Sequence, residues 1–76
     1  MKYELKCNAP RFECHREYDD QDTIAKSDFF SIQSQLEARG YSIRTYFRNV
    51  PDKPLRGHIE VEVDGFFYYV ELFKSK

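Results

Sequence analysis

The residues able to bind a soft metal ion or to act as a nucleophile are Cys7, Cys14, His15 and His58. Zinc sites join such ligands through short paired spacings, which these four residues lack. On a strand the neighbours Cys14 and His15 point to opposite faces, so they cannot form a nucleophile and its base. Cys14 with His58 is geometrically feasible but has no further support. We therefore predict no metal site, two small buried thiols in the reduced state, and two surface histidines.

The carboxylates offer another route to catalysis. Glu60 and Glu62 would lie about 6 to 7 Å apart on one face of a strand, a separation that glycosidases use. A chain of 76 residues, however, offers no deep cleft to exclude water from them. His58 opposite Glu71 is explained by a surface contact worth under about 1 kcal/mol. The three glycines are isolated, so there is no Gly-rich phosphate loop. We predict a protein that is not an enzyme, with no catalytic residue and no cofactor.

The element that positions these side chains is a hairpin over residues 58–73. Two β-prone runs flank Asp64-Gly65, a dipeptide typical of two-residue turns with left-handed backbone. The turn fixes the register from Val63 opposite Phe66 onward, so alternate residues share a face. One face is almost wholly apolar. The other carries the acids Glu60, Glu62 and Glu71 beside the rings of Phe67, Tyr69 and Phe73.

Period-two alternation predicts further strands at residues 2–7, 11–18 and 41–50, with a break at Asn8-Ala9-Pro10 between the first two. The first two strands would form an N-terminal hairpin. Between 18 and 41, helical spacing predicts a helix over residues 24–39.

This helix is expected to begin at a cap formed by Asp22 or Thr23, with Ser27 as a later alternative, and to end at Gly40. Its apolar stripe consists of Ala25, Phe29, Ile32 and Leu36. Phe30 falls off this stripe, and we expect it to be exposed. The stripe should pack across the apolar side of the sheet.

Together these elements predict one α+β domain over residues 1–76. It would contain an antiparallel sheet of four or five strands with one helix packed on one face. With 41% hydrophobic and 17% aromatic residues the chain can build a core, although a small one. The alternation does not specify the strand order.

Charge and hydropathy narrow the class of partner. The net charge of −1 gives no general attraction to nucleic acid or acidic membranes. Residues 39–57 are locally basic and residues 58–73 are acidic. Because the two segments should form neighbouring strands, we expect ion pairs between them. The sequence shows neither a signal-peptide pattern nor an apolar run of about 20 residues. We therefore expect a cytoplasmic protein that does not contact a membrane.

The sheet face away from the helix is the candidate binding surface. Large rings left in water, beside arginines, are typical of protein interfaces. The candidate partner-binding residues are Arg44, Tyr46, Arg48, Phe67, Tyr69 and Phe73. We expect a protein partner or a second copy of the chain, unless residues 8–22 fold over this face. The alternative is a single-stranded nucleic-acid-binding domain that uses the same face. Three glutamates and the absence of an RRM signature make nucleic acid the weaker hypothesis.

Overall fold

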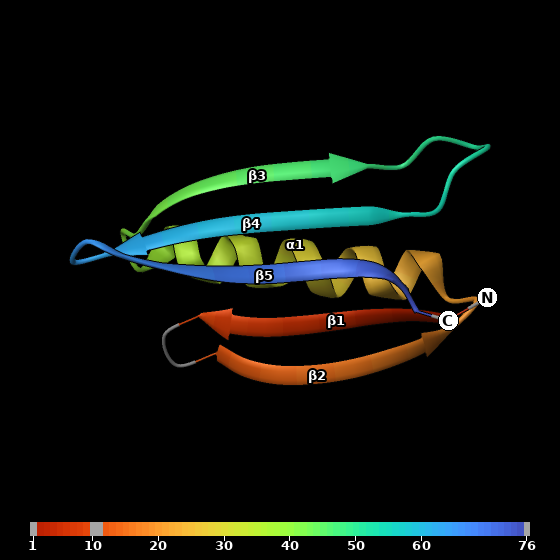
Figure 1. Cartoon of the computed structure of the whole chain (residues 1–76), viewed down its shortest axis with the longest axis horizontal. Coiled ribbons are helices and arrows are strands. Elements are labelled where there is room, and N and C mark those ends of the chain that lie inside the picture. The colour runs from red at the N-terminus through yellow and green to blue at the C-terminus, as the bar shows by residue number, and fades with distance from the viewer. Residues whose placement is uncertain (1, 10–11, 76) are drawn as a thin grey trace.

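The computed structural model describes residues 2–9 and 12–75, which form five strands and one helix (Figure 1). The elements are β1 Lys2–Ala9, β2 Phe12–Asp19, α1 Asp22–Ala38, β3 Ser42–Arg48, β4 Arg56–Val63 and β5 Phe66–Ser75. All neighbouring strands are antiparallel, in the order β2-β1-β5-β4-β3. The predicted α+β class, with an antiparallel sheet and one helix, is confirmed.

The hairpin of β4 and β5 has the predicted turn and register. Asp64 and Gly65 both adopt left-handed backbone, with φ of 52° and 83°. This is the conformation that a two-residue turn requires in order to match the twist of its strands. Pairing runs from Val63 opposite Phe66 to Gly57 opposite Leu72. The register therefore gives β5 one buried face and one open face, as the sequence predicts.

The N-terminal hairpin extends the sheet on the other side of β5. β1 pairs with β5 along nearly its whole length, and β2 pairs with β1 at the edge. The described residues of the 8–22 segment therefore do not fold over the open face. The break predicted at Asn8-Ala9-Pro10 is wrong for Asn8 and Ala9, because β1 continues through both residues and pairs them with β2. Pro10 and the strand start predicted at Arg11 lie outside the described residues.

Cys7 corrects the expectation of reduced thiols, because the structure holds it in a disulfide. In the register of β1 and β2 the backbone of Cys7 lies opposite that of Cys14, the other cysteine of the sequence. The predicted burial is confirmed for Cys7, whereas the side chain of Cys14 lies outside the described part of the chain.

Helix α1 begins two residues before the predicted start. Its N-cap is Gln21, which makes no side-chain capping bond, so the caps predicted at Asp22, Thr23 or Ser27 are wrong. Asp22 instead lies in the first turn, where the positive end of the helix dipole stabilises its negative charge. At the other end Gly40 has φ of 80° and donates its N–H to the Glu37 carbonyl, while Tyr41 donates to that of Leu36. This pair of bonds ends the helix at the predicted glycine.

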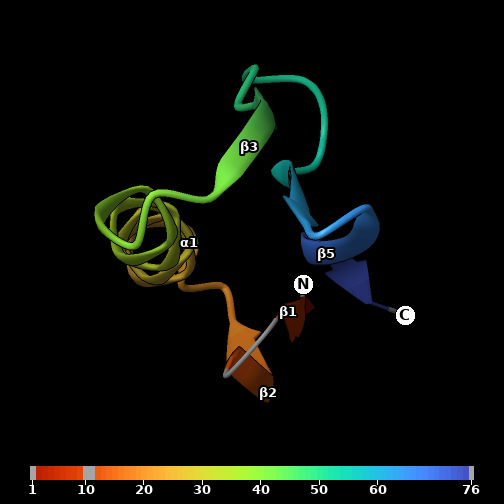
Figure 2. The same ribbon diagram turned by 90° about the vertical axis from the view of Figure 1, so that its left-hand side faces the viewer.

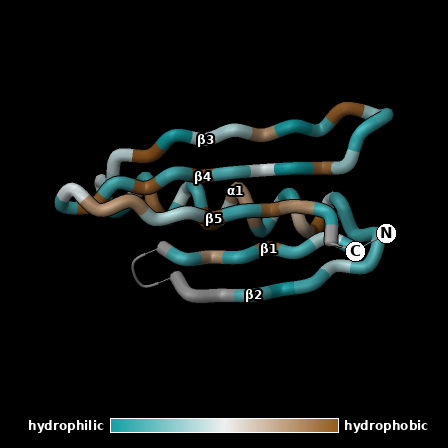
Figure 3. The backbone as a smooth tube through the Cα atoms, in the orientation of Figure 1, coloured by the Kyte–Doolittle hydropathy of each residue, from teal (hydrophilic) through white to brown (hydrophobic). Residues whose placement is uncertain are grey.

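The core lies between α1 and the concave side of the sheet. Figure 2 shows the sheet curving around the helix, with β2 and β3 at the two ends of the curve. Hydrophilic and hydrophobic residues alternate along the strands (Figure 3), and the residues turned to the helix are buried along β1 and β4 and in the second half of β5. On the same side Thr45 and Phe66 remain exposed. The buried hydrophobic residues are Tyr3, Leu5, Cys7, Tyr18, Ala25, Phe29, Leu36, Leu55, Ile59, Val61, Val70 and Leu72.

Phe30 is part of this core, so the prediction that it would be exposed is wrong. Its ring centroid lies 5.3 Å from that of Phe29 and 4.8 Å from that of Phe47. Because the sheet curves around the helix, it reaches side chains beyond the predicted stripe.

Arg16 interrupts the apolar pattern of β2 because it forms an ion pair with Asp28 on α1. Its Nη1 lies 3.2 Å from Oδ2 of Asp28, and the hydroxyl of Tyr18 donates to the same oxygen at 2.6 Å. Burial of the Tyr18 ring, together with this bond to a carboxylate, raises the pKa of Tyr18 to about 12. The edge strand is thus fixed to the helix by a polar contact as well as by packing.

Candidate functional site

The open face, defined as the side of the sheet away from α1, carries all six predicted partner-binding residues. Figure 1 views the sheet from this side, with α1 behind it. Tyr46 and Phe67 are each 53% exposed and Tyr69 is 40% exposed. Arg44 is exposed, while Arg48 and Phe73 are half-buried. Their neighbours Val70 and Leu72, which point to the helix, are fully buried.

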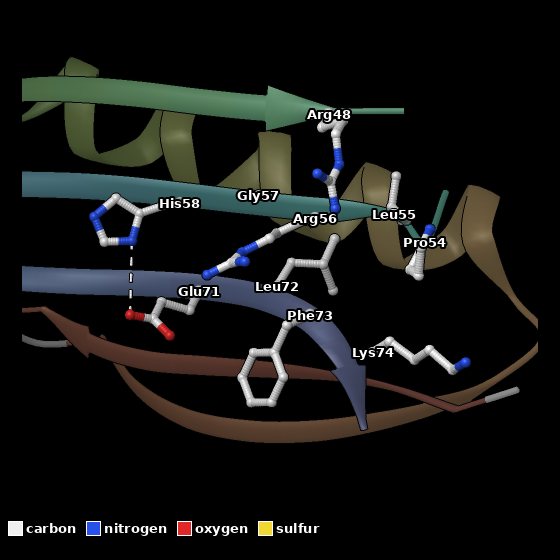
Figure 4. A pocket seen from close by; sticks show the side chains of 10 residues that line it. All are labelled: Arg48, Pro54, Leu55, Arg56, Gly57, His58, Glu71, Leu72, Phe73 and Lys74. Atoms are coloured by element: carbon white, nitrogen blue, oxygen red, sulfur yellow. Dashed lines mark ion pairs between the residues drawn. The ribbon is translucent and has the colours of Figure 1, made fainter. Parts of the chain in front are cut away.

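The six residues do not form one cluster, because three hollows divide the face. The turn hollow, of about 250 Å³, is lined by Ser42, Arg44, Glu60, Glu62 and Phe67. The central hollow, of about 470 Å³, is lined by Lys6, Cys7, Asn8, His15, Tyr69 and Glu71. The arginine hollow, of about 380 Å³, is lined by Arg48, Pro54, Leu55, Arg56, Gly57, His58, Glu71, Leu72, Phe73 and Lys74 (Figure 4). Five of the six predicted residues line these hollows, whereas Tyr46 lines none of the three.

His58 lies in the middle of the open face and lines the arginine hollow, which shares Glu71 with the central hollow. It is opposite Tyr46 on β3, and its ring centroid lies 5.2 Å from that of Tyr69 on β5. Its Nδ1 is 3.6 Å from a carboxylate oxygen of Glu71, the cross-strand pair that the register predicts. Both groups are partly exposed, so this contact is a weak surface interaction.

The expected ion pairing between the basic and acidic segments is wrong for the arginines of this face. Arg44 lies opposite Glu60 in the register, yet neither forms an ion pair within the described residues. Arg48 and Arg56 likewise have no carboxylate partner in the part of the chain that the structure describes. The guanidinium charges at this side of the sheet therefore remain available to an external group.

Arg48 has the most unusual environment of the three arginines. Its Nε is buried and has no hydrogen-bond partner among the described residues. Its strand position is directly opposite Arg56, so two like charges face each other across β3 and β4. A buried donor without an acceptor and a like-charge pair both cost stability, and an anion in the arginine hollow would relieve both costs.

Arg56, His58 and Lys74 line this hollow but were not among the predicted site residues. Arg56 falls in the segment 51–57 that Pro and Gly mark as a loop, whereas the structure starts β4 at this residue. The signal that locates it is the register of β3 with β4, in which Arg48 meets Arg56. That register depends on the conformation of the connecting loop, which the sequence pattern does not specify.

At the β2 edge of the open face, possible metal ligands on β1 and β2 lie close together. Ligand atoms of Glu4, His15 and Glu17 lie within 4.8 Å of one another. His15 and Glu17 are exposed, and Glu4 already contacts the Nε2 of His15 at 3.6 Å and the Nζ of Lys6 at 3.9 Å. Because Glu4 is engaged and the group is open to water, we assign no metal to it.

Two further observations bear on the class of protein. No helix in the described part of the chain is long and apolar enough to cross a bilayer. Comparison of the chain with protein-family models, with curated proteins and with solved structures gave no match.

Proposed function

We propose that this protein is a non-enzymatic protein-binding module of the inhibitor, adaptor or regulator type, which acts through the open face. The observation that carries the proposal is the exposure of Tyr46, Phe67 and Tyr69 on a sheet face that no described element covers. The single helix occupies the other face.

The energetics favour an external cover for these rings. Burying one such side chain fully contributes roughly 1.5 to 3 kcal/mol, and this fold leaves part of that energy unused for Tyr46 on β3 and for Phe67 and Tyr69 on β5. Tyrosine and arginine are the residues most often found at the energetic centre of protein interfaces. In this proposal Tyr46, Phe67, Tyr69 and Phe73 act as anchors. Arg44 and Arg48 orient the partner through their unpaired guanidinium groups.

Single-stranded nucleic acid is the alternative ligand of this face, because exposed rings and unpaired arginines also suit bases and phosphates. Against it stand Glu60, Glu62 and Glu71 on the same face, which would repel a phosphate backbone. A gel shift with single-stranded oligonucleotides at low and moderate salt separates the two. A salt-dependent shift supports nucleic acid, whereas the protein-binding proposal predicts none.

The cytoplasmic location expected from the sequence stays a prediction. The disulfide at Cys7 is more typical of proteins in oxidising compartments. The two expectations point to different compartments, and a protein can bind only partners in its own compartment. The cellular location should therefore be measured before a partner is sought.

Site-specific photo-crosslinking, carried out in cells of the organism that produces the protein, tests the proposal. A photoreactive amino acid replaces Tyr69 on the open face or, as a matched control, Ile24, which is 50% exposed on α1. The proposal predicts that position 69 yields one discrete crosslinked protein, identified by mass spectrometry, which then binds the purified chain. That protein can be a second copy of the chain, which sedimentation at increasing concentration would show. Crosslinking from position 24 but not from position 69 would contradict the proposal.

A further inference from the structure

We infer that the arginine hollow binds a side-chain carboxylate from an acidic segment of the partner protein. This inference rests on the proposed function and specifies the chemistry of the partner at one end of the open face.

The first support is the charge of the hollow. Its lining contains Arg48, Arg56 and Lys74 against a single carboxylate, that of Glu71. Glu71 already contacts His58, whereas the two arginines have no carboxylate partner among the described residues. The hollow is therefore an uncompensated positive region on a chain whose net charge is −1.

The second support is the arrangement of the two guanidinium groups. Figure 4 shows Arg48 reaching from β3 over β4, and Arg56 reaching from β4 toward β5. They occupy opposite positions in the register of β3 and β4. A carboxylate between two such planar donor groups can accept several charge-assisted hydrogen bonds, the geometry for which arginine is best suited.

The third support is the buried Nε of Arg48, which lacks a partner among the described residues. Buried donors in native proteins nearly always have an acceptor, and an exception calls for a ligand or another specific explanation. A carboxylate in the hollow would lie beside the Arg48 guanidinium, and a shift of this side chain would then give the Nε an acceptor. The negative charge of this carboxylate would also offset the positive charges of Arg48 and Arg56, whose strand positions are opposite each other.

The surroundings favour a carboxylate on a protein over a nucleic-acid phosphate. Outside the hollow, Glu60 and Glu62 lie along β4, and Glu4 lies opposite Phe73 on the neighbouring strand. A phosphate backbone that filled the hollow would have to pass these acids, whereas one carboxylate need not. Phe73, Leu55 and Pro54 give the hollow an apolar wall, against which the chain of a partner glutamate can pack.

The test is an NMR titration of the ¹⁵N-labelled full chain with an oligo-glutamate peptide, capped at both ends. The readouts are the backbone amides of residues 55–58 and 71–74 and the Nε–H of Arg48. Oligo-glutamine is the neutral peptide control, and oligothymidylate and inorganic phosphate are the phosphate controls. The inference predicts that oligo-glutamate shifts these signals, that oligo-glutamine does not, and that oligothymidylate binds more weakly.

Matched variants separate a site from general electrostatics. Arg48→Gln and Lys26→Gln each remove one positive charge, but Lys26 lies exposed on α1. Arg48→Gln should weaken the affinity for oligo-glutamate at least about tenfold, because it removes charge-assisted hydrogen bonds, and Lys26→Gln should leave it nearly unchanged. Equal weakening by both variants would overturn the inference, as would tighter binding of oligothymidylate or an absence of shifts at the hollow.

Failure of this inference is distinguishable from failure of the proposed function. Crosslinking from position 69 with no response of the hollow to oligo-glutamate would retain the open face as an interface and reject the carboxylate site. Loss of crosslinking at position 69 would reject the proposed function itself.

Discussion

Gly57 shows how one missing side chain allows this core to close. A Cβ built at this position would lie 2.7 Å from Cζ of Phe29, closer than real Cβ contacts. The Phe29 ring is fully buried and contacts the rings of Phe30 and Phe47, so it has little room to move. The glycine in β4 is therefore required for the packing of α1 on the sheet.

Gly57→Ala should lower the free energy of unfolding by about 1 to 3 kcal/mol, the usual cost of overpacking a core. Urea denaturation followed by circular dichroism measures the change. The double variant Gly57→Ala with Phe29→Leu should lose less stability than the sum of the two single changes, because the smaller side chain makes room for the methyl group. A neutral Gly57→Ala would contradict the observed approach of Phe29 to β4.

Tyr18 gives the stability a defined dependence on alkaline pH. Its pKa is raised from 10.0 to about 12, first by burial and then by its hydrogen bond to Asp28. The folded state thus binds this proton more tightly than the unfolded state. The resulting stabilisation is fully present below pH 10 and is lost as the pH rises toward about 12.

Tyr18→Phe should remove this part of the pH dependence. The measurement is the free energy of unfolding of both proteins at several pH values between 10 and about 12, where the wild type should fall more steeply than the variant. Parallel curves for the two proteins would show that the pKa of Tyr18 is the same in the folded and unfolded states.

At the scale of elements, the sequence predicts those turns, registers and helix ends that depend on a few neighbouring residues. The Asp64-Gly65 turn, the register of β4 with β5, and the stop of α1 at Gly40 each depend on one or two residues with left-handed backbone. The placement of β1 beside β5 depends on contacts between the ends of the chain, which no local pattern contains. The partial burial of Phe30 likewise depends on the ring of Phe47, which β3 brings against the helix.

The candidate site likewise contains residues that the sequence predicts and residues that it misses. The sequence predicts which side of the sheet carries Phe67, Tyr69 and Phe73, because alternation and one turn decide it. It misses Arg56, because the register of β3 with β4 is set by a loop containing two prolines rather than by a tight turn. The arginine hollow is therefore visible only once the strands are paired.

The disulfide at Cys7 makes the N-terminal hairpin dependent on redox conditions. The purified protein should show no alkylation of Cys7 until a reductant is added, as measured by mass spectrometry. Reduction should lower the free energy of unfolding by about 2 kcal/mol, the lower end of the usual contribution of a disulfide. Alkylation of Cys7 without reductant, or unchanged stability after complete reduction, would contradict this role.

At the scale of the whole molecule, the central fact is that one helix cannot cover both faces of a five-stranded sheet. Helix α1 fills the concave side, where the sheet curves around it. The convex side keeps Tyr46, Phe67 and Tyr69 in contact with water, together with arginines that have no carboxylate partner among the described residues. Rings that contribute little to the fold can be devoted to binding, so stability and affinity should respond separately to their removal.

The most direct test compares the wild type with the Phe67→Ala and Tyr69→Ala double variant, measuring both unfolding and affinity for the crosslinked partner. We predict a change in the free energy of unfolding below about 1 kcal/mol, because both side chains are exposed, and an affinity weakened at least about tenfold. Ile24→Ala, an equally exposed control on α1, should change neither quantity. Unfolding of the double variant, or full retention of affinity, would contradict the assignment of the open face as the binding surface.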